Sequence, residues 1–574
     1  MDKREVVRIL EEIALLLELK GENPFKVRAY TTAARVLEGT PVELGDLVAS
    51  GRLGELPGVG EALKEKIATL VSTGRLPYYD DLRSQFPSGI FEIVRIPGLG
   101  PKKVRLLWEK LGVSTLGELE YACHENRVAG LPGFGAKSQG KILQGIQILK
   151  QHRDRFLCNV ALEEAEALLE HLRGHPAVLR ISLAGSVRRR CETSKDVDLV
   201  ASSKEPKALM ETFISLPGIG EIVARGETKS SVRLASGIAA DLRVIGDREF
   251  PYALHHFTGS KEHHVALRAR AQRMGLKLNE YGLFRGEELL VCKDEAAIYS
   301  RLGLAFIPPE LREDRGEIEA AERGELPRLV EWEDLQGALH VHTNASDGSA
   351  SLEELAQAAT SLGMTYLGIC DHSQAAQYAG GLDVKRVSEQ HLAIDRLNRS
   401  QKGITVLKGI EVDILPDGNL DFTDDVLSRF DFVVASVHSR FSLSEAAMTR
   451  RIVRAIENPY VRILGHPTGR LLLAREPYPV DLKAVIGAAA EHGVCIELNA
   501  NPHRLDLDWR AIPSAKEAGI RISINPDAHH PVGLGDMRYG VGIARKGGLT
   551  KDDVLNTLSL KELLSFFHRR PARR

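Results

Sequence analysis

The pattern of hydrophobic and polar positions changes along the chain and separates it into regions. Residues 1–150 show helical spacing, beginning with the amphipathic stretch MDKREVVRILEEIALLLELK. Residues 151–245 and 246–312 mix helical stretches with short strand-like runs. Residues 313–334 are charged and interrupted by proline, which predicts an interdomain linker that contains helical pieces.

Residues 335–574 alternate helical stretches with seven near-continuous apolar runs. Runs of this kind are typical of parallel strands that are buried on both faces. Six of the seven carry a histidine or carboxylate near the C-terminal end, where barrel folds place their chemistry. The other run carries Glu497 and Asn499, to which the sequence assigns no role. The runs are ALHVHT, YLGICDH, ITVLKGIEVDI, FDFVVASVH, VRILGHP, GVCIELNA and RISINPDAH.

Length and composition narrow the class of protein. A chain of 574 residues exceeds what one hydrophobic core supports and indicates roughly three or four domains. The hydrophobic share of 43% is ordinary for a soluble protein, and no run of about 18 apolar residues predicts a membrane span. Charges throughout the N-terminal stretch argue against a signal peptide. The six cysteines are scattered without a CxxC pair, which indicates a reducing cytosol and argues against a cysteine-rich zinc site.

The formal net charge of −2 neither supports nor excludes a nucleic-acid partner, because acidic residues elsewhere can cancel a local basic stripe. A more specific signal is a Pro-Gly-x-Gly pattern that occurs three times, in LPGVGEALKEKI, IPGLGPKKVRLL and LPGFGAKSQGKIL. The glycines permit a tight turn, and the following helix presents free N–H groups to a phosphate. Such turns also begin ordinary helices, but three copies in one region favour repeated contact with phosphates. The glycines are Gly58, Gly60, Gly98, Gly100, Gly133 and Gly135.

These turns resemble helix-hairpin-helix motifs, which bind the DNA backbone without reading its sequence. A fourth similar stretch, LPGIGEIVARG from Leu216, leads into a segment that alternates like paired strands. We therefore assign that stretch to a sheet.

Three carboxylates in two predicted strands suggest a second kind of site. Asp196 and Asp198 lie two residues apart, so their side chains share one face of a strand, and the strand AADLRVI brings Asp241. Three carboxylates can hold two Mg²⁺ (or Mn²⁺) ions, which stabilise the attacking and leaving oxygens of an in-line displacement. Taken alone, a D-x-D pattern in a strand is often only a charged edge.

The segment LAGSVRRR upstream adds groups that suit a triphosphate. Gly185 allows close approach of the backbone, Ser186 can donate a hydrogen bond, and Arg189 offers a charged fork. Together with D-x-D and DLRV, this spacing resembles the nucleotidyltransferase palm of family X DNA polymerases.

The segment HFTGSKEHHVALRAR resembles the YFTGS-type sugar pocket of the same family. The resemblance implies that Phe257 and Gly259 line the deoxyribose side of the nucleotide and that Arg268 faces the template or minor groove. Two positions depart from the family pattern: His256 stands where tyrosine is frequent, and His264 where asparagine is usual. Both changes bear on sugar discrimination and fidelity and leave the metal carboxylates untouched.

The N-terminal region is similar to the small lyase-type domain of that family. Lys66 matches the position where some members form a Schiff base with a 5′-deoxyribose phosphate, chemistry that requires a depressed lysine pKa. A lysine on a DNA-binding helix more often contacts a phosphate, so simple 5′-phosphate binding is the favoured alternative.

Nine imidazoles and carboxylates in the last 240 residues predict a metal cluster. One structural zinc needs only four ligands, so nine predict two or three Zn²⁺, Mn²⁺ or Fe ions and an open position for a hydrolytic water. The set resembles the PHP (polymerase and histidinol phosphatase) family, with its H-x-H opening, central Glu and closing D-x-H. The expected ligands are His340, His342, Asp347, His372, Glu411, His438, His466, Asp527 and His529.

From end to end, the chain resembles bacterial-type family X polymerases that carry a C-terminal PHP domain. The resemblance implies a multidomain α/β protein: a helical helix-hairpin-helix region, an α+β palm with a thumb, and a seven-stranded, distorted TIM-like (β/α) barrel. The expected divisions are 1–90 (lyase-type), 91–150 (helix-hairpin-helix fingers), 151–245 (palm), 246–312 (thumb), 313–334 (linker) and 335–574 (PHP).

The implied function is gap filling in base-excision-type DNA repair, with 3′–5′ exonuclease or 3′-end processing by the barrel and with incision at abasic sites as a further possible reaction. The implied partners are gapped or nicked double-stranded DNA and deoxynucleoside triphosphates, without a membrane. We expect a cytoplasmic, nucleoid-associated monomer. Two alternatives compete. One is a phosphoesterase that uses its N-terminal half only to hold DNA ends, and the other is a non-catalytic DNA-end-binding scaffold.

Overall fold

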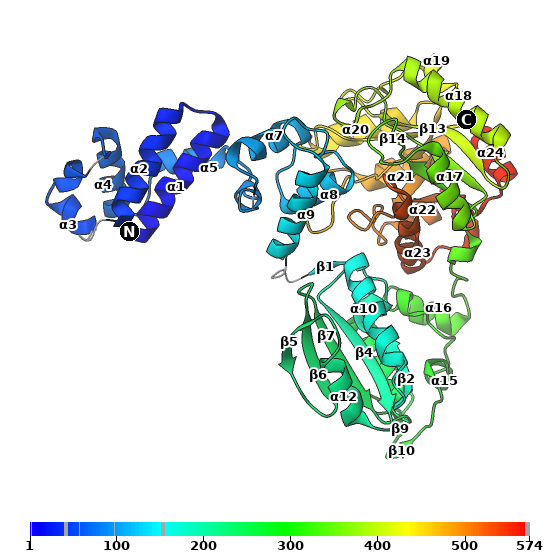
Figure 1. Cartoon of the computed structure of the whole chain (residues 1–574). Helices are drawn as coiled ribbons and strands as arrows, with labels where there is room; N and C mark the ends of the chain where they lie inside the picture. Colours follow the sequence, from blue (N-terminus) through cyan, green and yellow to red (C-terminus); the bar gives the residue numbers. More distant parts are fainter. Residues whose placement is uncertain (2, 40–43, 57, 97, 151–154, 569–574) are drawn as a thin grey trace. The chain divides into compact units, whose positions relative to one another are not determined.

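The computed structural model describes the chain except for residues 2, 40–43, 57, 97, 151–154 and 569–574. The chain divides into two compact units, Met1–Ile146 and Gln147–Arg574 (Figure 1). Within the described residues, no helix is both long enough and apolar enough to cross a membrane.

The first unit is helical throughout its described residues. Its longest helix buries Leu10, Ile13 and Leu17, which recur at the spacing of one helix face. A capping box between Thr115 and Glu118 begins α8. The elements are α1 (Lys3–Lys20), α2 (Pro24–Gly39), α3 (Leu44–Ala49), η1 (Arg52–Glu55), α4 (Glu61–Thr73), α5 (Pro77–Ser84), α6 (Ile90–Ile93), α7 (Pro101–Leu111), α8 (Leu116–His124) and α9 (Ala136–Lys150).

The second unit begins with a five-stranded sheet of order β2-β4-β7-β6-β5, in which β4 and β7 are parallel and the other pairs antiparallel. We call residues 151–245 the palm region. The similar stretch after Leu216 forms β5, as the alternation predicted. The elements are β1 (Phe156–Leu157), α10 (Cys158–Arg173), β2 (Val178–Leu183), α11 (Gly185–Arg188), β3 (Thr193–Ser194), β4 (Asp196–Ser203), α12 (Pro206–Ile214), β5 (Ile219–Ala224), β6 (Lys229–Leu234) and β7 (Ala239–Ile245).

The alternation of apolar and acidic residues along β4 determines which face of the palm sheet carries Asp196 and Asp198. Val197 and Leu199 are buried in the same apolar cluster as α10 and α12. Because successive side chains of a strand point to opposite faces, Asp196 and Asp198 point away from that cluster.

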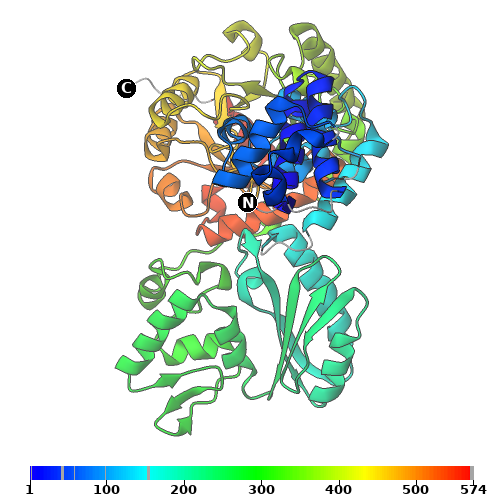
Figure 2. The ribbon, with the colours of Figure 1, turned by 90° about the vertical axis from the view of Figure 1, so that its left-hand side faces the viewer.

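Residues 246–312, which we call the thumb region, lie beside the palm sheet (Figure 2). The predicted linker that follows contains α16, whose Ile318 and Ala321 belong to the thumb-region core. The elements are α13 (Phe250–Thr258), α14 (Lys261–Arg273), β8 (Lys277–Leu278), β9 (Leu283–Arg285), β10 (Glu288–Leu289), α15 (Glu295–Arg301), η2 (Pro309–Leu311), α16 (Glu317–Arg323) and η3 (Trp332–Asp334).

The seven apolar runs form a seven-stranded, wholly parallel sheet in sequence order, as predicted. The sheet curves into a nearly closed barrel, because the His342 N–H donates to the Ala528 carbonyl (2.9 Å) and joins the first strand to the last. The strands are β11 (Gly337–Val341), β12 (Tyr366–Ile369), β13 (Thr405–Asp413), β14 (Phe432–Ser436), β15 (Val461–Leu464), β16 (Cys495–Asn499) and β17 (Ile522–Asn525).

The helices of the barrel follow its strands, as parallel connections require. They are α17 (Leu352–Ser361), η4 (Gln377–Ala379), α18 (Val384–Ser400), α19 (Asp424–Leu427), α20 (Glu445–Ile456), α21 (Leu482–His492), α22 (Ile512–Glu517), η5 (Pro531–Asp536), α23 (Met537–Lys546), η6 (Lys551–Asp553), η7 (Leu555–Thr557) and α24 (Leu560–His568). The palm region and the barrel share one buried apolar cluster, which includes Leu162 of α10 and Ile543 of α23.

Candidate active sites

All nine predicted ligands of the barrel lie in its strands or in the loops that follow them. Glu411 is central: its Oε1 lies 3.0 Å from His466 Nε2 and 3.2 Å from His438 Nε2. The same oxygen lies 3.2 Å from His340 Nε2, and Oε2 lies 2.9 Å from His372 Nδ1. One carboxylate therefore contacts imidazoles that follow or belong to four different strands.

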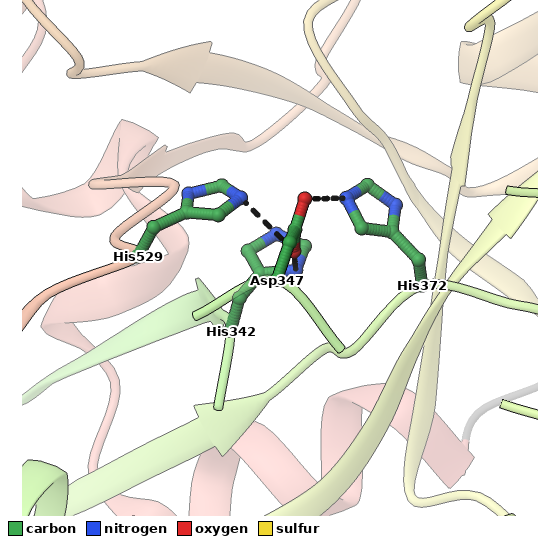
Figure 3. A group of neighbouring side chains, drawn as sticks. All are labelled: His342, Asp347, His372 and His529. Carbon is green, nitrogen blue, oxygen red and sulfur yellow. Dashed lines mark ion pairs between the residues drawn. The ribbon is translucent and has the colours of Figure 1, made fainter. Parts of the chain in front are cut away.

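Asp347 is the second carboxylate on which imidazoles converge (Figure 3). Its Oδ1 lies 3.3 Å from His529 Nε2 and 3.8 Å from His342 Nδ1, and its Oδ2 lies 3.4 Å from His372 Nε2. On the other side of the site, His342 Nε2 lies 3.1 Å from Asp527 Oδ1.

These contacts form three overlapping sets whose potential ligand atoms lie within 4.8 Å of one another. His342 and His372 each belong to two sets, so neighbouring metal ions would share ligands. The sets are His342, Asp347, His372 and His529; His340, His342 and Asp527; and His372, Glu411 and His438.

The chemistry of the donor atoms fits divalent cations. Several of these close contacts are not hydrogen bonds: among the described residues, buried atoms without a hydrogen-bond partner include His340 Nε2, His342 Nδ1, Asp347 Oδ2 and Glu411 Oε2. Unsatisfied buried polar atoms are costly, and a bound ion would satisfy them. Burial alone would raise the pKa of Glu411, but the imidazoles around it, that of His438 foremost, hold this pKa well below its ordinary value.

Three of the candidate ligands have strained backbones. His340 has φ of 60°, Asp527 of 51° and His466 of 24°, in the left-handed region that non-glycine residues rarely adopt. Strain of this kind persists where the surrounding structure imposes it, which is common at functional sites.

Glu497, to which the sequence assigned no role, supports two of the candidate ligands. It is fully buried, and its carboxylate lies 2.6 Å from His340 Nδ1 and accepts from the His466 N–H (2.7 Å). Asn525 Nδ2 (2.8 Å) and Asn499 Nδ2 (3.2 Å) also donate to it. Because Glu497 occupies Nδ1, the Nε2 atom of His340 is directed at the cluster. Glu497 lies in the apolar run GVCIELNA, in a position comparable to that of the candidate ligands in the other six runs. That position was the sequence feature from which its role could have been inferred.

A second supporting carboxylate is Asp413, whose Oδ1 lies 2.6 Å from His438 Nδ1. Asn499, the other residue without a predicted role, donates to Asp527 Oδ2 (3.0 Å). Neither contact could be predicted from the sequence, because neither residue stands in a recognisable ligand pattern.

The palm region brings its three predicted carboxylates together. Asp198 and Asp241 are direct partners in the parallel pair β4–β7, and Asp196 precedes Asp198 on the same face. Burial, followed by the charges of Asp196 and Asp241, raises the pKa of Asp198 to about 6. Lys229 Nζ lies 2.6 Å from Asp241 Oδ2 and balances part of this charge.

The predicted triphosphate turn packs directly on these carboxylates. Gly185 has φ of +59°, and a Cβ added there would lie 2.2 Å from Asp198 Oδ2, so only glycine fits. Ser186 Oγ donates to Ser194 Oγ (2.9 Å). Arg189 donates to the Thr258 carbonyl and, from Nε, to Glu313 Oε1 (3.1 Å), so its guanidinium is held between the palm and thumb regions.

The predicted sugar pocket lies next to the same arginine. A Cβ added to Gly259 would lie 2.8 Å from Arg189 Nη1, and Phe257 stacks under the Arg243 guanidinium at 4.2 Å. The exposed Arg268 donates to the His264 carbonyl (3.3 Å).

The two histidines that depart from the family pattern contact each other. The rings of His256 and His264 stack at 5.3 Å, and His264 Nε2 lies 2.6 Å from the His256 carbonyl oxygen. Burial is the main reason that the pKa of His264 falls to about 3.

In the first unit, the three Pro-Gly-x-Gly turns have the same backbone form. The first glycine of each has positive φ, at 82° for Gly58, 87° for Gly98 and 81° for Gly133. The second glycine of each, Gly60, Gly100 or Gly135, directly precedes a helix: α4, α7 or α9. Pro57 and Pro97 of two turns lie outside the described residues.

Lys66 lies in α4, directly after the first of these turns. Its Nζ donates to Tyr30 Oη (2.5 Å) and lies 4.0 Å from the centre of the Tyr78 ring. The amine is therefore held between two aromatic residues of the same unit.

Comparison with known families accounts for most of the chain. A helix-hairpin-helix domain family matches residues 1–76, and a SAM-like helix-hairpin-helix tandem family matches 91–147. The DNA polymerase beta thumb family matches 253–313, and the PHP domain family matches 338–501.

Two relatives illustrate these similarities. The DNA polymerase/3′-5′ exonuclease PolX of Bacillus subtilis is 39% identical over 99% of this chain and 100% of its own length. A probable phosphatase of Thermoanaerobacter sp. is 32% identical over 38% of this chain and 89% of its own length.

The raised pKa of Asp198 predicts a stability change with pH in metal-free protein. Because the folded pKa of about 6 exceeds the ordinary value of 3.8, this carboxyl destabilises the fold as pH rises through that range. Asp198→Asn should therefore raise the Tm at pH 7.5 in EDTA by roughly 2–5 °C, with the gain vanishing near pH 4. Calorimetry against the exposed control Asp552→Asn checks this; an unchanged or lower Tm for Asp198→Asn contradicts it.

The position of Glu497 predicts a selective loss of metal from the barrel. Glu497→Gln keeps the shape of the side chain but removes the carboxylate that orients His340, so metal affinity should fall about 10- to 100-fold. Chelator competition followed by metal analysis measures this. The control is Glu491→Gln, an exposed position on α21. Equal metal retention in the two variants would show that Glu497 does not support the site.

Proposed function

The chain belongs to the family X DNA polymerases that carry a C-terminal PHP domain, and on that premise we propose that it fills short DNA gaps and processes DNA 3′ ends. The observation that carries the proposal is the presence of two separate carboxylate clusters in one compact unit. One cluster is Asp196, Asp198 and Asp241, and the other surrounds Glu411.

We assign nucleotide incorporation to the palm region. Its three carboxylates would hold two Mg²⁺ or Mn²⁺ ions, which when bound neutralise charge on the phosphates during an in-line displacement. The chain's own contribution is positioning. Gly185 and Ser186 form the turn that would bind the triphosphate, and Phe257 and Gly259 would line the sugar.

We assign hydrolysis of 3′ ends to the barrel. Its nine side chains would hold two or three Zn²⁺, Mn²⁺ or Fe ions, which when bound lower the pKa of a water and polarise the phosphate. Glu497 and Asp413 orient the imidazoles, and the buried site limits access of other water.

The first unit would hold the DNA duplex on either side of the gap. The three glycine turns, each followed by a helix, suit phosphate contacts without sequence selection. Lys66 would contact the 5′ phosphate of the gap, and Schiff-base formation is the alternative role for this lysine. The protein would act as a monomer on gapped or nicked DNA in the cytoplasm.

A single gapped substrate with a labelled primer tests the division of labour. Asp198→Ala should lower nucleotide incorporation roughly 1000-fold, because a metal-binding carboxylate is lost, and should leave 3′-end hydrolysis intact. His340→Ala should have the reverse effect. The assay measures primer extension and primer shortening with Mg²⁺ or Mn²⁺.

The outcomes separate this function from its competitors. Hydrolysis without nucleotide incorporation in the wild type would identify a phosphoesterase whose N-terminal half serves only to hold DNA. Tight gap binding without either reaction would identify a scaffold. Unchanged incorporation in Asp198→Ala would overturn the assignment of the palm region.

A further inference from the structure

The segment 188–194 links the predicted triphosphate turn to the catalytic strand β4, and residues of the barrel contact it along its length. Glu192 accepts a hydrogen bond from Arg470 Nη2 of the barrel, and Arg510 Nη1 lies 3.6 Å from its other oxygen. Glu192 and Arg470 are both largely buried. Such a pair is geometrically demanding, because each charge loses its water.

The other end of the segment is held through Lys546 of α23. Lys546 is 4% exposed, and its ammonium pairs with Glu313, the carboxylate that also accepts from Arg189 Nε (3.1 Å). The same ammonium lies 3.4 Å from the Arg189 carbonyl oxygen. A barrel helix thereby contacts both the backbone and the carboxylate partner of a predicted triphosphate residue.

Between these two contacts, the segment passes close to α23. Arg190 has φ of +54°, a conformation that non-glycine residues rarely adopt, so the surroundings must hold it. A Cβ added to Gly542 of α23 would lie 3.3 Å from three carbons of the Arg190 side chain. The barrel helix is therefore shaped to accept this side chain.

We propose that Lys546 and Arg470 of the barrel are positioning residues for nucleotide binding, because they hold Arg189 and Glu192, two residues of the segment that joins the triphosphate turn to Asp196. This inference rests on the proposed function of the palm region. Arg470 also follows the candidate ligand His466 by four residues, and the Gly469 N–H donates to the His466 carbonyl (3.0 Å). The barrel would thus be part of the polymerase as well as a hydrolase.

The test measures incorporation by the full-length protein on gapped DNA with Mg²⁺. Lys546→Met and Glu192→Gln should each raise the KM for the incoming deoxynucleotide about 10-fold, with a smaller change in kcat and the KM for DNA unchanged. Lys546→Arg, which keeps the charge, should restore the nucleotide KM. Hydrolysis of single-stranded DNA and barrel metal content should match the wild type.

A matched control is Arg538→Gln, which breaks another ion pair between the barrel and the palm region. Arg538 pairs with Glu163 of α10, outside the segment, so its loss should leave the nucleotide KM unchanged. If Lys546→Met and Glu192→Gln also leave that KM unchanged, the proposal is wrong. Parallel loss of incorporation and hydrolysis would also overturn it, because the contacts would then stabilise the whole unit and not specifically position the nucleotide site.

Failure of the broader function gives a different result. If the wild type does not incorporate nucleotides, or Asp198→Ala does not abolish incorporation, the palm assignment fails before the interface variants are compared. If both wild-type activities are present, the KM values alone decide whether the barrel positions the segment.

Discussion

Burial of charged and polar side chains away from water is the constraint on which both sites depend. Burial and two neighbouring carboxylates act together on Asp198, which is why its pKa rises to about 6. Glu411 and Asp347 are compensated by imidazoles, but those imidazoles present buried nitrogens of their own that have no hydrogen-bond partner among the described residues, as at His340 and His342. Divalent cations would resolve both problems, because they satisfy lone pairs and cancel negative charge.

The surrounding fold holds these carboxylates and imidazoles in a defined geometry. Strand pairing sets Asp198 directly beside Asp241, and the joining of β11 to β17 closes the barrel around its cluster. The buried carboxylate of Glu497 then fixes the orientation of His340. Positive φ at His340 and Asp527 shows that the surrounding structure holds strained backbone at the cluster.

Features that repeat along the chain could be predicted from the sequence. The seven strands were evident because strands buried on both faces are apolar without interruption, and the candidate ligands stand where those runs end. The glycine turns could be predicted because the same Pro-Gly-x-Gly pattern recurs three times, and the first glycine of each turn has positive φ. The roles of individual residues within these sites stay predictions.

Contacts between distant segments could not be predicted. Arg470 and Glu192 are 278 positions apart, and neither stands in a motif. Arg312 directly precedes the charged segment expected to be a linker and Glu317 lies within it, yet both are buried. A charged residue in a sequence is normally solvated, so its burial depends on a partner that only the fold supplies.

The most direct test of the account is anomalous X-ray scattering from crystals of protein purified with its bound metal. The account predicts two or three transition-metal peaks in the barrel, about 2.0–2.3 Å from ligand atoms of Glu411, His342 and His372. A barrel without metal peaks, or with a metal bound by other residues, would contradict it.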